Sequence, residues 1–257
     1  MSRLSESKVP DNTPIIIGAG QYVERLQQRS TPPFSSPMQL AANACQTALK
    51  DASVPATEID TIAVIRLFSD TVKTWSSPFG GSNNPPESVA RRIGATPAHR
   101  VYSNAGGTEP LHVMVELLQA IARGEKKCVL LTGAEAIASQ RFALRNGFED
   151  NWREEFDVPF ENREYRQRFV SGEEISCGLS LPVRSYAVIE NIEAHQMGND
   201  LQQHRQYMAK MMAPFSEVSA TNPYSQSPTS YSEQDLAESG PCLIGSPSAR
   251  NRVAKPS

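Results

Sequence analysis

The sequence has few of the residues that usually mark a metal site or a disulfide framework. Its 257 residues include only four cysteines and four histidines. The cysteines are far apart, none forms a Cys-x-x-Cys pair, and the histidines do not combine with them at zinc-ligand spacing. We therefore expect no metal, reduced thiols and a cytoplasmic location.

Long apolar runs and a large charge of one sign are also absent. No apolar stretch reaches the length of a transmembrane helix, and residues 1–13 are polar, without the apolar segment of a secretory signal. The formal net charge of −3 does not favour a nucleic-acid groove or a polybasic membrane patch. These absences predict no membrane span and no nucleic-acid partner.

The first half of the chain alternates between strand-like and helix-like segments. Continuous apolar strands separated by helices are typical of a mostly parallel sheet covered on both faces, which is an α/β fold. The expected strands are 14–20, 59–68, 99–104 and 126–136, and the expected helices are 36–52, 84–95 and 108–124.

The character of the chain changes after about residue 137, where charged and aromatic residues replace the apolar pattern. We expect an α/β domain at 14–139, followed by a mainly helical loop or excursion domain at 140–237. The polar residues 1–13 and the proline-, serine- and glycine-rich residues 238–257 are expected to be disordered.

The stretch GAGQYV at 18–23 follows an expected strand and raises the question of a dinucleotide site. The fingerprint GxGxxG requires a third glycine, and the sequence has Val23 there. Nicotinamide binding is therefore not expected.

The stretch NAGGTEP at 104–110 leads directly into an apolar helix. Free backbone N–H groups at a helix start, with glycines that permit close approach, favour an anion or a developing oxyanion. Alternatively, the glycines only allow tight strand-to-helix packing. On the same helix, His112 and Glu116 could be a base and its orienting partner, or part of a polar stripe. The candidate substrate-binding residues are Asn104, Gly106, Gly107 and Thr108.

The string from 101 to 139 resembles the central stretch of the thiolase superfamily, in particular acetyl-CoA acetyltransferase-like proteins of the sterol-carrier type. The resemblance covers residues 14–136 well and 181–223 more weakly. The residues that match the family's helix end and following strand are Ile121, Gly124, Gly133, Ala134 and Glu135.

The resemblance implies a layered, thiolase-like N-terminal half. Its expected parts are a mixed, mostly parallel five-stranded sheet of order 3-2-1-4-5, a buried central helix at 108–124, a helical loop domain, and a dimer interface at the strand near 99–104. It also implies an acyl-CoA thioester as substrate, a place in lipid metabolism, and no other cofactor.

Two departures from the family leave the catalytic residue unknown. The position of the family's nucleophilic cysteine falls on Gly107, which has no side chain. No second half with its histidine and second cysteine is recognisable, so we expect a protein that is inactive alone, as a homodimer or with a partner chain that supplies this half. The alternatives are a non-catalytic interaction or lipid-handling module, or a truncated inactive fragment.

Overall fold

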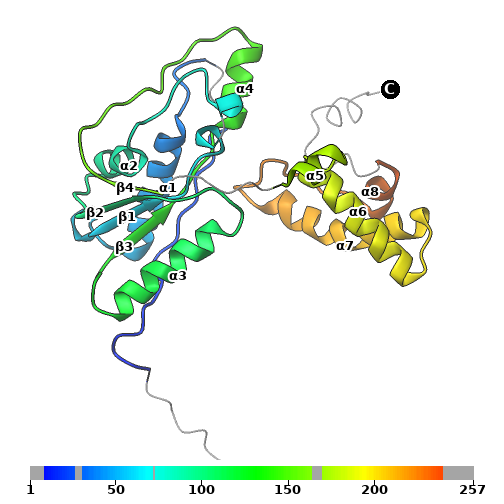
Figure 1. Cartoon of the computed structure of the whole chain (residues 1–257), viewed down its shortest axis with the longest axis horizontal. Helices are drawn as coiled ribbons and strands as arrows, with labels where there is room; N and C mark the ends of the chain where they lie inside the picture. The colour runs from blue at the N-terminus through cyan, green and yellow to red at the C-terminus, as the bar shows by residue number, and fades with distance from the viewer. Residues whose placement is uncertain (1–8, 27–30, 72, 164–169, 240–257) are drawn as a thin grey trace, which may run out of the picture. The chain divides into compact units, whose positions relative to one another are not determined.

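The computed structural model describes residues 9–26, 31–71, 73–163 and 170–239 (Figure 1). The terminal segments expected to be disordered therefore lie largely outside the described residues, except for 9–13 and 238–239. The chain divides into two compact units, Met1–Arg166 and Gln167–Ser257. In the described part, no helix combines the length and the apolar character needed to cross a membrane.

The first unit is built on a parallel sheet of four short strands in the order β3-β1-β2-β4. The strands are β1 (Thr61–Val64), β2 (His99–Tyr102), β3 (Val129–Thr132) and β4 (Glu161–Asn162). The α/β class and the parallel crossovers are confirmed, whereas the expected mixed, five-stranded sheet is wrong in strand count for the described residues. Since β4 pairs with β2, the strand at 99–102 is not the free edge that the expected dimer interface requires.

The expected first strand at 14–20 does not join the sheet. These residues have no strand partner, and β3 pairs directly with β1, where the expected order would place 14–20 between them. Gly18 and Gly20 instead pack against a helix, because a Cβ on Gly20 would lie 2.2 Å from the carbonyl oxygen of Ala44. Close backbone approach explains this glycine pair.

Helices α1 (Pro37–Ala52) and α2 (Pro85–Ile93) cover one face of the sheet (Figure 1). Each begins with a proline after a capping residue. The Ser36 hydroxyl accepts a hydrogen bond from the N–H of Gln39, and the Asn84 side chain accepts one from Glu87. A buried apolar cluster joins both helices to the sheet, with Met38, Cys45, Ile62, Val64, Val89 and Tyr102 among its members.

Helix α3 (Glu109–Ala122) covers the opposite face. Its Val113 and Leu117 are buried against the sheet residues Ala63 and Val101. The expectation of a buried central helix holds for this side only. On the side that faces away from the sheet, Leu111 and Val115 are 56% and 44% exposed, so the described residues of the first unit leave them uncovered.

A second apolar cluster closes the unit beside helix α4 (Ile137–Arg145). Trp152 lies edge-on to Phe79, with 5.0 Å between ring centroids, and its indole N–H donates to the carbonyl of Phe34 at 3.2 Å. Both α4 and β4 come after residue 136 and pack with the first unit. The short 3-10 turns are η1 (Ala56–Glu58), η2 (Phe68–Asp70) and η3 (Lys73–Trp75).

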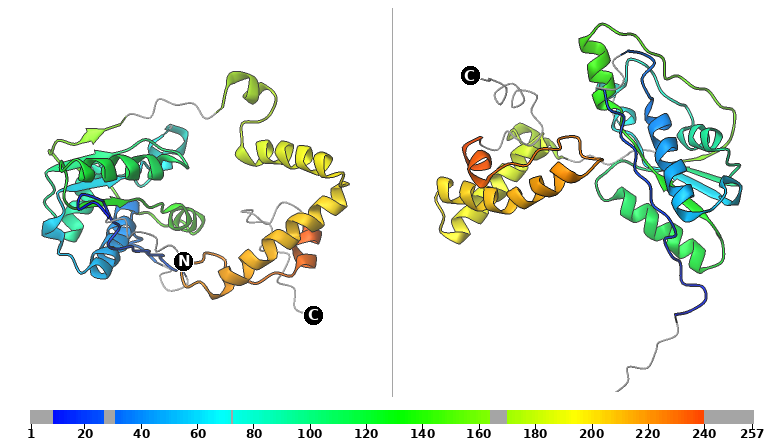
Figure 2. Two further views of the ribbon diagram at one scale, coloured as in Figure 1. Left: turned by 90° about the horizontal axis from the view of Figure 1, so that it is seen from below. Right: turned by 180° about the vertical axis from the view of Figure 1, so that it is seen from behind.

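The second unit is helical in its described part (Figure 2). Its helices are α5 (Gly172–Ser176), α6 (Pro182–Met197), α7 (Leu201–Thr221) and α8 (Glu233–Ser239). Helix α7 begins with a capping box between Asp200 and Gln203, and it continues through Pro214.

Candidate functional site

The turn from Asn104 to Thr108 connects β2 to α3, as the sequence predicts. Gly106 has a φ of 150°, a backbone conformation that favours glycine. Gly107 and Thr108 are exposed, and a Cβ added at Gly107 would meet no heavy atom within 4 Å. Gly107 is therefore not required for tight packing, which removes the alternative explanation at this one position.

The backbone of the turn leaves two donors free at the start of α3. The N–H of Glu109 donates to the carbonyl of Gly106 at 3.2 Å, and the Glu109 carboxylate accepts from the N–H of Asn104 at 3.2 Å. The N–H groups of Gly107 and Thr108 have no hydrogen-bond partner in the described part of the chain. Thr108 occupies the N-cap position, but its hydroxyl makes no capping bond. Exposed donors at a helix start attract anionic or polarised oxygen atoms.

The hypothesis that His112 and Glu116 act as a pair is wrong. The His112 ring lies 3.8 Å from the Glu109 carboxylate, whereas Glu116 binds Arg163 through two hydrogen bonds of 2.6 and 2.8 Å. The hydrogen bonds from Arg163 hold the pKa of Glu116 below its ordinary value, and this carboxylate pairs with Arg163 and does not orient His112.

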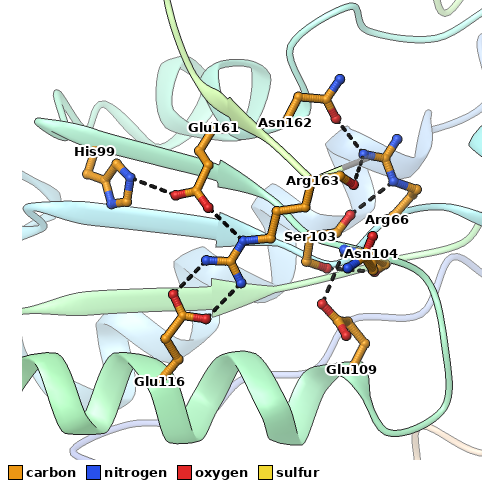
Figure 3. A network of polar contacts seen from close by, with 9 residues as sticks. All are labelled: Arg66, His99, Ser103, Asn104, Glu109, Glu116, Glu161, Asn162 and Arg163. Atoms are coloured by element: carbon orange, nitrogen blue, oxygen red, sulfur yellow. Dashed lines mark hydrogen bonds and ion pairs between the residues drawn. The ribbon is translucent and has the colours of Figure 1, made fainter. Parts of the chain in front are cut away.

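An arginine that the sequence analysis missed holds the strand ends beside the turn (Figure 3). Arg66, just after β1, donates to the carbonyl of Ser103 at 3.0 Å, to the Asn162 side chain at 2.5 Å and to the carbonyl of Arg163 at 2.7 Å. Its guanidinium carbon lies 4.2 Å from the centroid of the Tyr102 ring. Arg66 thus fixes the residue that precedes Asn104.

Arg163 forms a second anchor at the same end of the sheet, directly after β4 (Figure 3). Besides Glu116 on α3, it binds the Glu161 carboxylate at 2.8 Å, and Glu161 in turn lies 3.1 Å from the His99 ring nitrogen. The hydrogen bonds with Glu116 raise the pKa of Arg163 further above its ordinary value. The pair joins α3 to the outer strand β4, so the turn lies between two fixed elements.

A polar cavity of about 580 Å³ has Arg66 among its lining residues. Tyr102 lines this cavity and donates a hydrogen bond to the Asp70 carboxylate. Burial, followed by the Asp70 charge, raises the pKa of Tyr102, so its hydroxyl stays protonated. Arg153, Glu154 and other polar residues of the first unit complete the lining, but Gly106, Gly107 and Thr108 do not take part in it.

The described thiols lie elsewhere. Cys45 is buried in α1, and burial raises its pKa to about 11. Cys128 precedes β3 at the amino ends of the parallel strands, whereas the turn follows the carboxyl end of β2. Cys177 belongs to the second unit, and Cys242 lies outside the described residues. No described thiol of the first unit is therefore placed to act at the turn.

One group of possible metal ligands occurs in the second unit, although the sequence predicts none. Glu190, Glu193 and His204 bring their ligand atoms within 4.8 Å of one another. His204 is buried, and its Nε2 atom lies 2.7 Å from Glu190. This contact pairs a histidine of α7 with a carboxylate of α6.

Comparison with known proteins identifies the fold of this chain. No protein-family model matches the chain, and no curated protein matches it. A solved structure does match: a monomeric SCP2-thiolase-like protein type 1 from Mycobacterium smegmatis, with 31% sequence identity and a TM-score of 0.62. The match covers 89% of this chain and 40% of that chain.

The chain therefore has a thiolase-like fold of the SCP2 type, and the resemblance seen in the sequence is confirmed at that level. The chain spans less than half the length of the matched structure. Asn104, Gly106, Gly107 and Thr108 stay predicted site residues, and their placement at the start of α3 is the geometry from which a function can be argued.

Proposed function

We propose that this thiolase-like chain binds an acyl-CoA thioester at the turn formed by Asn104, Gly106, Gly107 and Thr108. The observation that supports this most is the pair of exposed, unpaired N–H groups at Gly107 and Thr108, at the start of a 14-residue helix. A thioester carbonyl that accepts from both donors would be polarised by them and by the positive end of the helix dipole.

The same turn explains why the chain would bind without turnover. Acyl transfer needs a nucleophile next to the polarised carbonyl, and Gly107, where the thiolase resemblance puts that nucleophile, has no side chain. We therefore propose binding alone, with catalysis dependent on a partner chain. Action in lipid metabolism and a cytoplasmic location belong to this proposal, and the three free cysteines of the described residues are consistent with the latter.

A substitution that removes one donor tests the binding site. Thr108→Pro deletes the backbone N–H, and the φ of −94° at this position is near the range that proline adopts. Thr108→Ala keeps the N–H and is the matched control. We expect acetyl-CoA, measured by calorimetry at millimolar ligand, to bind about tenfold more weakly to Thr108→Pro than to Thr108→Ala. Equal binding by both variants, or no binding by the unchanged chain, would refute the proposed site.

Restoring a thiol tests the chemistry that the turn could support. Gly107→Cys introduces a side chain where an added Cβ meets nothing within 4 Å, so the variant should fold normally. The helix start lowers the pKa of a thiol placed there, and we expect this thiol to attack acetyl-CoA, forming an acetyl thioester and releasing the CoA thiol, as seen by a mass increase of the protein. Thr108→Cys, one residue further on, is the positional control. Equal acetylation of both variants would show that the turn does not orient the thioester.

A further inference from the structure

Helices α6 and α7 bring two carboxylates and one imidazole together within the second unit (Figure 1). Glu190 and Glu193 lie about one turn apart on α6, and His204 lies in the first turn of α7. One ligand atom of each side chain lies within 4.8 Å of the other two. The sequence does not indicate this grouping, because His204 and Glu190 are 14 positions apart on different helices.

His204 is a buried polar ring that is directed at this acidic pair. Its side chain is only 5% exposed, and its Nε2 atom faces the Glu190 carboxylate at 2.7 Å. The other ring nitrogen, Nδ1, is buried and has no hydrogen-bond partner among the described residues. The ring also stacks on Tyr207, with 5.8 Å between centroids. No polar group outside the cluster therefore explains why this imidazole is buried here.

The two carboxylates of the cluster have too little positive charge around them. Glu190 and Glu193 are three residues apart on one helix, where like charges repel each other. Glu193 has no hydrogen bond or ion pair among the described residues, and no described lysine or arginine pairs with Glu190. With a neutral imidazole, the cluster carries two negative charges, which one divalent cation balances.

The second unit has little apolar core to hold α6 against α7. Among its described residues, the buried side chains are Ala194, Ala209, Ala213 and His204. Alanine buries little area, and the large apolar side chains of both helices are exposed to a substantial degree. Small units with a thin core are often stabilised by a structural metal ion.

We propose that Glu190, Glu193 and His204 bind one Zn²⁺ ion, which links α6 to α7. Zinc takes carboxylate and imidazole ligands at about 2.0–2.2 Å, so tetrahedral ligand atoms lie about 3.4 Å apart. Rotation of the two glutamate side chains shortens the separations in the cluster to this value. The three protein ligands leave a fourth position for water.

The ligand types select the class of metal. An imidazole nitrogen suits Zn²⁺, whereas Mg²⁺ and Ca²⁺ prefer oxygen ligands alone. No thiolate belongs to the cluster, so a softer ion such as Cu⁺ is not favoured. The cluster lies in the second unit, so this inference is independent of thioester binding at Thr108.

Calorimetric titration of the full, chelator-treated chain with zinc chloride tests the proposal. We expect one Zn²⁺ per chain, bound equally well in millimolar Mg²⁺. Glu193→Gln keeps the shape of the side chain but removes a charged ligand, and His204→Asn removes the imidazole. Each should weaken binding at least about tenfold. The matched controls, Glu217→Gln on α7 and His195→Asn on α6, change exposed residues and should bind zinc like the unchanged chain.

Two further measurements cover the case in which His204→Asn does not fold. Co²⁺ in place of Zn²⁺ should give the visible absorption of a four-coordinate site, without the near-ultraviolet band of a cobalt–thiolate bond. Circular dichroism should show that Zn²⁺ raises the thermal midpoint of helix loss in the unchanged chain and in Glu217→Gln, but not in Glu193→Gln. Because Glu193 has no partner in the described chain, its replacement should not unfold the unit.

Four results would overturn the proposal. An absence of zinc uptake by the unchanged chain would show that His204 and Glu190 form a pair without a metal. Equal zinc affinity of Glu193→Gln and Glu217→Gln would show that the ion binds elsewhere. A cobalt–thiolate band would assign the metal to a cysteine such as the exposed Cys177. Displacement of zinc by millimolar Mg²⁺ would indicate an unselective acidic surface.

Discussion

Replacing Arg66 is expected to destabilise the first unit, and the loss should be larger for methionine than for lysine. Arg66 makes three hydrogen bonds, to the carbonyls of Ser103 and Arg163 and to the Asn162 side chain, and its guanidinium lies over the Tyr102 ring. These contacts connect the end of β1 to the residues that follow β2 and to β4. Arg66→Met removes all of them, whereas Arg66→Lys keeps the charge and one flexible donor group.

The loss in free energy of unfolding for each substitution follows from the number of hydrogen bonds that it removes. A hydrogen bond with one charged partner contributes about 1.5–3 kcal/mol when buried, and Arg66 is only half-buried, which lowers this toward about 1 kcal/mol. Three bonds give about 3 kcal/mol for the free energy of unfolding lost in Arg66→Met. A lysine replaces about one of them, so we expect a loss of about 2 kcal/mol in Arg66→Lys.

Tryptophan fluorescence in urea measures this loss for the first unit alone, because Trp75 and Trp152 are the two tryptophans of the sequence and both lie in that unit. With a slope of about 2 kcal/mol per molar urea, the midpoint should fall by roughly 1.5 M in Arg66→Met and 1 M in Arg66→Lys. Arg145→Met, at an exposed arginine of α4, is the control and should shift little.

Two outcomes would contradict this reasoning. An Arg66→Lys midpoint equal to that of the unchanged chain would mean that the planar guanidinium, with its several donors, adds nothing to the stability of the first unit. Equal losses in Arg66→Lys and Arg66→Met would mean that no single donor can replace any of the three bonds.

Two further predictions concern glycine packing and thiol chemistry. Gly20→Ala should lower the urea midpoint by the equivalent of about 1–3 kcal/mol, since the added Cβ meets the α1 backbone, whereas Gly107→Ala should leave it unchanged. A Gly20→Ala midpoint equal to that of the control would show that the segment yields without cost. Burial raises the pKa of Cys45 to about 11, so this thiol stays protonated at pH 8 and should react with iodoacetamide only after unfolding, unlike the exposed Cys177. The same shift stabilises the fold below the ordinary thiol pKa, and this contribution is lost as the pH rises through about 11. Mass spectrometry of labelled peptides decides, and rapid labelling of Cys45 in the native chain would contradict the burial.

The helices of the first unit could be predicted closely from the sequence because their signals are local. The Ser-Pro and Asn-Pro-Pro starts predict helices at 36–52 and 84–95, and the structure has them at Pro37–Ala52 and Pro85–Ile93. A capping side chain and the residue it caps are three positions apart, so no distant part of the chain is needed to form the contact.

The local sequence pattern could not decide whether residues 14–20 form a strand of the sheet. PIIIGAG has the composition of a buried strand, but a strand exists only where a neighbouring edge supplies its hydrogen bonds. In this chain β3 lies beside β1, and the described residues supply no pairing strand for 14–20. The two-residue strand β4 was missed for the opposite reason, since its charged residues carry no apolar pattern.

The candidate site shows the same difference between features with a local sequence signal and features that depend on distant parts of the chain. The turn at 104–108 is visible in the sequence because two glycines precede an apolar helix. Arg66 and Arg163 were missed because their partners lie far along the chain, with 96 positions between Arg66 and Asn162 and 47 between Arg163 and Glu116. The mixed charges after residue 150 are typical of a solvated surface. Only the fold shows that one of them, Arg163, binds Glu116 on α3.

The contact between Arg163 and Glu116 sets an order of events during synthesis. Helix α3 and the turn before it leave the ribosome long before Arg163 does, so the nascent chain presents this helix without its tether to β4. The apolar side chains of Leu111 and Val115, which stay exposed even in the finished unit, are then available to chaperones or to another nascent chain. Whatever partner this protein has could therefore meet it before translation is complete.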